Sequence, residues 1–195
     1  MSPAIRASFW MSGAIVSFTL MAVAGRAVSL DLDTFEIMMY RSIIGFVIVS
    51  CLVFAFGQRS QVRAHRLGTH LLRNISHFAG QNLWFFAITA APLAQVFALE
   101  FTSPIWAIFL AAIILGERLT LVKLSAALFG FIGVLIISRP FGGSVDIGLL
   151  TAGLSAIGFA GSAVFTRLLT RTETIASILF FLTLMQFLLG LFFAG

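Results

Sequence analysis

The stretch from Asn82 to Pro140 reads NLWFFAITAAPLAQVFALEFTSPIWAIFLAAIILGERLTLVKLSAALFGFIGVLIISRP. It begins inside one long apolar run and contains two more, which are separated by the polar segment GERLT. A helix needs about 20 mostly apolar residues to cross a lipid bilayer. Apolar runs of this length, joined by short polar segments, predict helices packed side by side in a membrane.

The rest of the chain has the same character. Of its 195 residues, 60% are hydrophobic and 10% are charged, whereas a soluble domain carries about 25% charged residues. Such a chain would expose large apolar patches to water. We therefore expect an all-α, polytopic transmembrane bundle in the lipid bilayer. Its seven predicted spans are Ser8–Leu30, Phe35–Gly57, Asn74–Ala91, Ala94–Leu115, Leu121–Ser138, Ile147–Leu169 and Ile175–Ala194.

The basic residues lie between the apolar runs, so the net charge of +5 points to membrane orientation and not to nucleic acid. With a cytoplasmic N-terminus, most of them fall on the inner side: Arg6, Arg59, Arg63, Arg66, Arg73, Arg118, Lys123, Arg167 and Arg171. The outer segments then hold Arg139 and the acidic residues Asp31, Asp33, Glu36 and Asp146. This asymmetry follows the positive-inside rule and predicts a cytoplasmic N-terminus.

The stretch Gln58–Arg73 is the longest polar connection. Its basic residues recur at alternating spacings of four and three, which is typical of one face of a helix. They are Arg59, Arg63, Arg66, His70 and Arg73. We expect a short interfacial helix that rests this face on anionic lipid headgroups.

Small residues recur on single faces of two predicted spans. Ala126, Gly130 and Gly133 share a face in the fifth span, and Gly158 and Ser162 share one in the sixth. Small residues let helix backbones approach closely inside a membrane. Such faces serve packing within one chain or the interface of a homodimer.

The chain contains a weak internal repeat. At an offset of 141 residues, Phe18 aligns with Phe159 and Ala22 with Ala163. Because the two copies are five spans apart, the second copy runs through the membrane in the opposite direction. Inverted repeats are typical of secondary carriers.

Several motifs together resemble the EamA repeat of the drug/metabolite transporter superfamily. The third span is aromatic and ends in APLA, and a serine-proline pair follows in the fourth span. The matching positions are Tyr40-Arg41-Ser42, Ala91–Ala94, Ser103-Pro104, Gly116–Thr120 and Ser138-Arg139-Pro140. By this resemblance, Arg41, Pro104, Glu117 and Arg118 are structural motif residues.

The resemblance implies a plasma-membrane carrier, in a bacterium an inner-membrane one, built from two inverted repeats of five spans each. It would move a small organic solute, such as an amino acid, a metabolite or a drug-like amine, by alternating access. Residues 1–140 would form the first repeat, and residues 141–195 the first two helices of the second. Because the chain ends inside an apolar run, we expect either a fragment of a longer chain or a shortened gene product. A non-transporting scaffold or an inactive truncated carrier is the alternative.

Enzyme chemistry is not expected from the motifs. The sequence has no HExxH or GxSxG pattern and no nucleotide-binding loop, and these are the patterns that would indicate a metalloprotease, a serine hydrolase or an ATPase. No catalytic residue, cofactor or metal ligand is therefore assigned.

Charged residues inside spans each cost about 2.5–3.5 kcal/mol on insertion scales, and Arg26, Arg41 and Glu100 need an explanation. Glu100 lies four residues before Pro104, which cannot donate the helix hydrogen bond to its carbonyl. Glu100 either binds a cationic solute or a coupling proton, or forms an ion pair with Arg26 or Arg41. Arg26 either holds an anionic group of the solute or extends to the interface.

Uncharged polar and aromatic residues form a second candidate group. His77 and Gln81 share a helix face at a spacing of four, and Gln95 follows in the next span. They line a wet cavity or form hydrogen bonds between helices. Trp84 either stacks on a flat solute or packs in the bundle.

Overall fold

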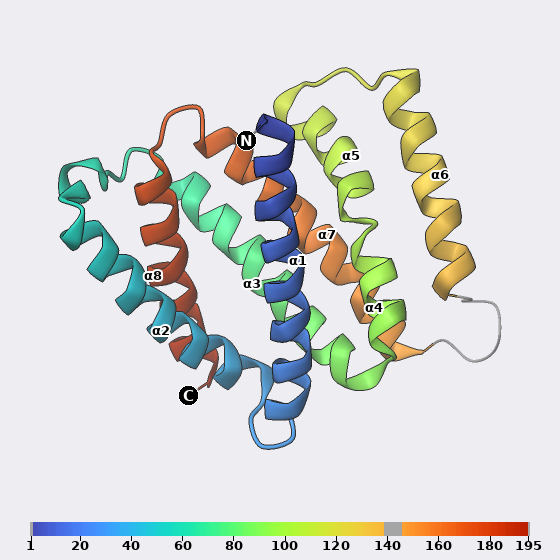
Figure 1. Ribbon diagram of the computed structural model, residues 1–195, viewed down its shortest axis with the longest axis horizontal. Coiled ribbons are helices and arrows are strands. Elements are labelled where there is room, and N and C mark those ends of the chain that lie inside the picture. The colour runs from blue at the N-terminus through green and yellow to red at the C-terminus, as the bar shows by residue number, and fades with distance from the viewer. Residues whose placement is uncertain (1, 139–145, 195) are drawn as a thin grey trace.

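In the computed structural model, which describes residues 2–138 and 146–194, all regular elements of these ranges are helices (Figure 1). The expected all-α class is confirmed. Arg139, Pro140 and the expected repeat boundary lie outside the described ranges. In chain order the elements are α1 (Pro3–Val28), α2 (Thr34–Ala55), η1 (Gln58–Gln61), α3 (Leu67–Ala90), α4 (Leu93–Glu100), α5 (Ser103–Leu115), α6 (Leu121–Ser138), α7 (Ile147–Leu169) and α8 (Ile175–Ala194).

Five stretches of the described chain are helices long and apolar enough to cross a membrane: α1, α2, α4 together with α5, α7 and α8. The apolar part of α6, Leu121–Ile136, is shorter. Helix α3 has 24 residues, but it carries charged and amide side chains along its length. The polytopic bundle is confirmed, with α3 as its polar member.

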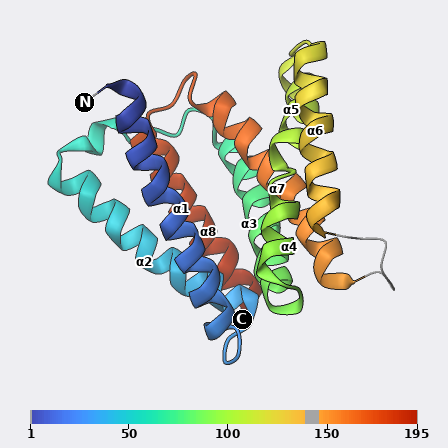
Figure 2. The same cartoon turned by 45° about the vertical axis from the view of Figure 1, so that its right-hand side comes forward.

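The helices form two groups around a shared centre. Helices α1, α2 and α8 lie on one side and α4, α5 and α6 on the other, with α3 and α7 between them (Figure 2). The most extensive helix contact joins α3 to α7, and the next joins α2 to α8. Helix α3 therefore touches both groups and forms the core of the molecule.

Successive connections alternate between the two ends of the bundle. The N-terminus, η1, the α5–α6 loop and the α7–α8 loop lie at one end, at the top of Figure 1. We call it the basic end, because these segments carry Arg59, Arg118 and Arg171. The α1–α2 loop, with Asp31 and Asp33, lies at the opposite end. The segments that share a predicted side of the membrane thus share an end of the bundle.

The expected interfacial helix over Gln58–Arg73 is wrong. Gly57, with a φ of 65°, ends α2 in the left-handed region that favours glycine, and only a single 3₁₀ turn, η1, follows before α3 begins at Leu67. His70 and Arg73 are buried inside the bundle. The third helix starts earlier than predicted, because Arg73 donates to Thr166 of α7 and the His70 ring packs against Phe181 of α8.

The fourth span is broken, as Pro104 leads one to expect. Helix α4 ends at Glu100 and α5 begins at Ser103. Because proline has no backbone N–H, the helical ladder is interrupted here, and the N–H of Thr102 turns to the carbonyl of Leu99 at 3.0 Å. The break places the Glu100 side chain at a helix end inside the bundle.

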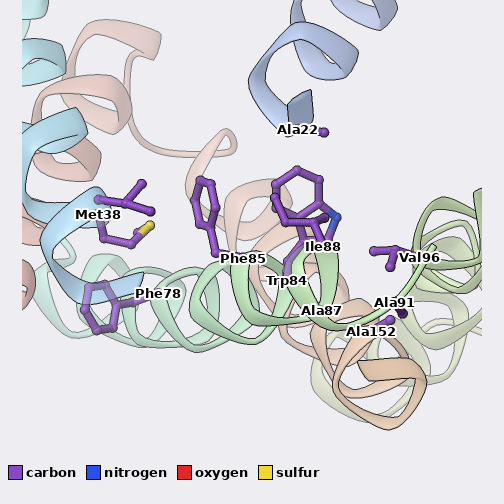
Figure 3. Packing of buried hydrophobic residues seen from close by; sticks show 11 residues of the cluster. Ala22, Met38, Phe78, Trp84, Phe85, Ala87, Ile88, Ala91, Val96 and Ala152 are labelled. Atoms are coloured by element: carbon purple, nitrogen blue, oxygen red, sulfur yellow. The ribbon is translucent and has the colours of Figure 1, made fainter. Parts of the chain in front are cut away.

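The packing around α3 joins three helices. Trp84, Phe85 and Ile88 point from α3 toward Ala22 of α1, and Met38 of α2 lies beside Phe85 (Figure 3). All five side chains are buried. This apolar layer fixes α3 against α1 and α2 next to the broken span.

On its other side α3 approaches α7 at a glycine contact. A Cβ placed on Gly158 would lie 2.7 Å from the Cα of Gly80, so only glycine fits this crossing. The small-residue face expected on the sixth span is therefore a packing face within the chain.

On α6 a Cβ at Gly133 would meet nothing within 4 Å, and one at Gly130 would meet only Ile105 at 3.8 Å. In the described chain the face expected on the fifth span therefore meets a side chain of α5 at Gly130 but makes no close backbone crossing.

Candidate functional site

The hydrogen bond between Trp84 and Glu100 forms the centre of the site. The indole Nε1–H of Trp84 donates to Oε2 of Glu100 at 2.7 Å. Trp84 is 1% exposed, because it stands on the face of α3 that packs toward α1. Glu100 is half-buried at the end of α4. The structure thus brings two predicted site residues from different spans into direct contact.

Two further aromatic rings, those of Phe18 and Phe97, stand beside this pair. The ring centroid of Phe18 lies 5.4 Å from that of Trp84 and 6.2 Å from that of Phe97, and Trp84 and Phe97 are 6.3 Å apart. The rings come from α1, α3 and α4. The π faces of Phe18 and Phe97 can stack on a flat group or attract a cation.

A cavity of about 380 Å³ opens between α1 and α4 beside these rings. Apolar side chains form most of its wall, and Glu100 contributes the charge. Its lining residues are Ala14, Ile15, Phe18, Thr19, Phe97, Glu100 and Phe101. Apolar walls with a few placed polar groups are typical of small-molecule sites.

Glu100 does not form the ion pair that the sequence left open. Among the described residues the ion pairs are His65–Glu173, Lys123–Glu117 and Arg167–Glu117. Neither Arg26 nor Arg41 contacts the Glu100 carboxylate within ion-pair distance. The carboxylate therefore faces the cavity with only the neutral Trp84 donor hydrogen-bonded to it in the described chain.

Arg26 holds the end of α3. Its Nε donates to the carbonyl of Ile88, and its Nη2 donates to the carbonyl of Ala91 at 2.5 Å. The last carbonyls of a helix have no helical donor, and a positive charge is favourable there. In this structure Arg26 therefore acts as a side-chain cap, a role that we did not weigh from the sequence.

The other predicted polar residues are not among the residues that line the cavity. Arg41 donates from Nη2 to Oε1 of Gln81 at 2.5 Å, which joins α2 to α3. His77 faces α7, where its Nδ1 lies 3.4 Å from Oγ of Ser162. Gln95 is half-buried on α4. The row on α3 is thus divided between α2 and α7.

A model of the EamA-like transporter family matches residues 5–139, the part of the chain that holds α1 to α6 and the whole cavity. The chain belongs to this family.

Curated relatives in the comparison are transporters. The riboflavin transporter of Brucella anthropi is 37% identical over 139 residues, which are 71% of this chain and 49% of that protein. An S-adenosylmethionine uptake transporter of Rickettsia prowazekii is 24% identical over 88% of this chain and 58% of its own length. The pseudopaline exporter CntI of Pseudomonas aeruginosa is 29% identical over 85% and 58%, respectively. The chain thus spans about half the length of the curated relatives it matches, and no solved structure matches it.

The GERLT motif of this EamA chain forms a charged tie at the basic end. Glu117 accepts from Nζ of Lys123 at 3.2 Å and lies 2.6 Å from Nη1 of Arg167. The hydrogen bond from Lys123, helped by the charge of Arg167, lowers the pKa of the Glu117 carboxyl below its usual value. The motif thereby joins the α5–α6 loop to α6 and α7, while Arg118 is exposed.

Sequence reasoning missed Phe18 and Phe97 as walls of the cavity. The chain contains 22 phenylalanines, and in a membrane helix an apolar residue carries no periodic signal for the face that points inward. The spacing of Phe97 and Glu100, three residues apart on one helix face, is the one sequence feature that could have indicated Phe97.

Proposed function

We propose that this chain acts in a secondary carrier of the EamA family, and that the Glu100 cavity binds the solute it moves. The observation that carries the proposal is the Trp84–Glu100 hydrogen bond, at 2.7 Å, beside a cavity at the break of a membrane span. Carriers often place their substrate contacts where a transmembrane helix is interrupted. A helix break that only relieved proline strain would need neither a carboxylate nor an aromatic wall.

The chemistry of the cavity favours a solute with a flat or cationic part. An ionised carboxylate in an apolar wall is costly unless it is paired, so Glu100 takes up either a cationic solute group or a coupling proton. The rings of Phe18 and Phe97, which line the cavity, stack on a flat group at low entropic cost. A solute that combines both features would fill the cavity best.

The names of the relatives agree with this chemistry. Riboflavin carries a flat aromatic ring system, and S-adenosylmethionine carries a cationic sulfonium centre together with an aromatic base. We propose a solute of this general kind, an aromatic or cationic metabolite of moderate size. The direction of transport is left open, because uptake and export proteins both occur among the relatives.

Movement by alternating access is part of the proposal. Residues 1–140 would form the first repeat, and residues 141–195 would begin the inverted second repeat. In support, α7 and α8 run opposite to α1 and α2 in Figure 1. The shared basic end supports a cytoplasmic N-terminus by the positive-inside rule.

Solute flux through the reconstituted full chain tests the proposal. Proteoliposomes would be assayed for uptake of radiolabelled riboflavin and S-adenosylmethionine, with protein-free liposomes as the blank. We expect saturable uptake of at least one compound, which excess unlabelled compound abolishes. Uptake no faster than the blank for both compounds and for a panel of organic amines would instead support a non-transporting scaffold.

A further inference from the structure

The buried face of α3 is polar along most of its length. His70, Arg73, His77, Gln81 and Trp84 follow one another at spacings of three and four, so they form a single stripe on the helix. This stripe faces α2, α7 and α8. Its end near Leu67 lies toward the basic end, and its other end reaches the Glu100 cavity.

Arg73 is a buried cation with neutral partners. It is 8% exposed, its Nε donates to Oγ1 of Thr166 at 3.1 Å, and its Nη1 donates to Oδ1 of Asn74 at 3.4 Å. In the described chain no carboxylate lies within ion-pair distance of its guanidinium group. Buried charges in proteins are normally paired, and this guanidinium still has donors to offer.

His70 provides a second, independent sign of a missing partner. Its side chain is fully buried, and neither ring nitrogen has a hydrogen-bond partner. It lies three residues before Arg73 on the same face of α3. The carboxylate of Glu173 already accepts from the backbone N–H of Arg66 and pairs with His65. Buried polar groups rarely lack partners, and the protonated ring nitrogen of His70 can donate to an anionic group beside Arg73.

The neighbouring helix α8 adds a buried amide to this polar cluster. Gln186 is 2% exposed and donates from Nε2 to the backbone carbonyl of Asn74 at 2.9 Å. Its Oε1 has no partner within the described chain. Polar groups of α3, α7 and α8 thus converge on Arg73 and His70.

We propose that Arg73 and His70, with Asn74 and Thr166 beside them, form an inner binding site for an anionic group, a carboxylate or a phosphate, of the transported solute. The planar guanidinium fork matches both anions. This inference rests on the proposed carrier function. Arg73 and Trp84 are eleven residues apart, or roughly 16 Å along α3 at 1.5 Å per residue. The inner site is therefore a separate binding site from the Glu100 cavity. Its burial means that the solute enters when α7 or α8 moves away from α3.

Anion binding to the purified full chain tests this site without any need for flux. The melting temperature would be followed by tryptophan fluorescence against sodium phosphate and sodium acetate, with sodium chloride at equal ionic strength as the reference. We expect a saturable rise with at least one of the two anions, and the stronger one identifies the class. No saturable rise with either anion overturns the inference.

Two variants with matched controls locate the site. Arg73→Lys keeps the charge but loses the fork, and His70→Phe places a second phenyl ring beside Phe181, whose ring centroid lies 4.9 Å from that of His70. Each should weaken anion binding about tenfold or more, whereas the exposed-site variants Arg171→Lys and His65→Phe should bind as wild type does. If Arg73→Lys fails to fold, His70→Phe decides.

The two proposals fail in different ways. Wild-type affinity in His70→Phe, or equal weakening in the two control variants, shows that the anion binds elsewhere on the basic surface and overturns the inner site. A protein that transports solute but binds neither anion overturns the inner site alone. A protein that binds an anion at Arg73 but shows no flux overturns the proposed carrier function.

Discussion

Trp84 contributes both a ring and a hydrogen-bond donor to the candidate site. The ring packs against Phe18 and Phe97, and the indole N–H holds the Glu100 carboxylate in a wall that is otherwise apolar. These contributions are separable, because phenylalanine keeps an aromatic ring but has no donor. The position of the carboxylate, which would decide what the cavity binds in the proposed carrier, therefore depends on a neutral side chain of another helix.

Trp84→Phe should lower both stability and solute affinity. Loss of the donor leaves a half-buried acceptor without its partner, at a cost of about 1–3 kcal/mol in the free energy of unfolding. Unfolding in mixed micelles would measure this loss. Trp106→Phe, on the more exposed α5 face, is the matched control. Equal effects of the two substitutions would show that ring size, and not the hydrogen bond to Glu100, is what matters.

Arg26→Gln should destabilise the bundle with little effect on the chemistry of the cavity. Its guanidinium holds the carbonyls of Ile88 and Ala91 at the end of α3, and charge-assisted hydrogen bonds of this kind contribute about 1.5–3 kcal/mol each. The same unfolding measurement applies, with the exposed Arg6→Gln as control. Unchanged stability together with weaker binding of anionic solutes would instead make Arg26 a ligand.

At this scale the sequence predicted which residues matter better than it predicted their partners. Glu100 and Trp84 meet in the candidate site, and both could be singled out because a charge inside a span and a rare aromatic residue stand out in a membrane sequence. Arg26, His77 and Gln81 are buried or half-buried as polar span residues should be, but they serve α3, α7 and α2. Which neighbouring helix a polar side chain contacts depends on how each helix is rotated about its own axis. The spacing of residues in a single sequence does not reveal that rotation.

The packing of α7 against the bundle depends most closely on the residues at its crossing with α3. Gly158→Ala would place a methyl group 2.7 Å from the backbone of Gly80, and forcing the helices apart should cost about 1–3 kcal/mol. Gly153→Ala on the same helix meets nothing within 4 Å and should stabilise α7 by up to about 1 kcal/mol. Thermal unfolding of both variants checks the pair. Equal behaviour would contradict the close crossing.

The α5–α6 loop gives a pH prediction with a definite sign. Glu117 has a pKa lowered by Lys123 and Arg167, so its charged form favours the folded state. This contribution is complete above the unfolded-state pKa of the group and is lost as the pH falls through the folded-state value. Acid titration of stability should therefore be less steep in Glu117→Gln. Because the tie is exposed, the effect should be small and should shrink at high salt; identical acid profiles would show that the tie is not formed.

Helix ends show where pattern reasoning succeeds and where it fails. The predicted bounds of the spans at Leu121, Ile147 and Ile175 agree with α6, α7 and α8, because acidic and threonine-rich loops interrupt the apolar runs there. The prediction of an interfacial helix over Gln58–Arg73 failed because a spacing of three and four identifies a helix face but not what surrounds that face. His70 and Arg73 lie on such a face, and that face is buried against α7 and α8.

On the scale of the whole molecule, α3 is the element on which both proposals depend. It is the polar member of an apolar bundle, it contacts both helix groups (Figure 2), and it carries Trp84 at one site and Arg73 at the other. The fold class and the transporter family follow from apolar runs and short motifs that any reader of the sequence can find. The position of α3 at the centre does not, because its composition alone resembles that of a surface helix.

Solute uptake by Glu100→Gln in proteoliposomes tests the central claim most directly. The substitution keeps the size of the side chain and the acceptor for Trp84 but removes the charge that faces the cavity. Glu36→Gln is the matched control, because glutamine also serves the capping box that Glu36 forms with Asp33 at the start of α2. The account predicts normal membrane insertion of both proteins, uptake by Glu36→Gln at the wild-type rate, and loss of uptake in Glu100→Gln. Wild-type uptake by Glu100→Gln would contradict it.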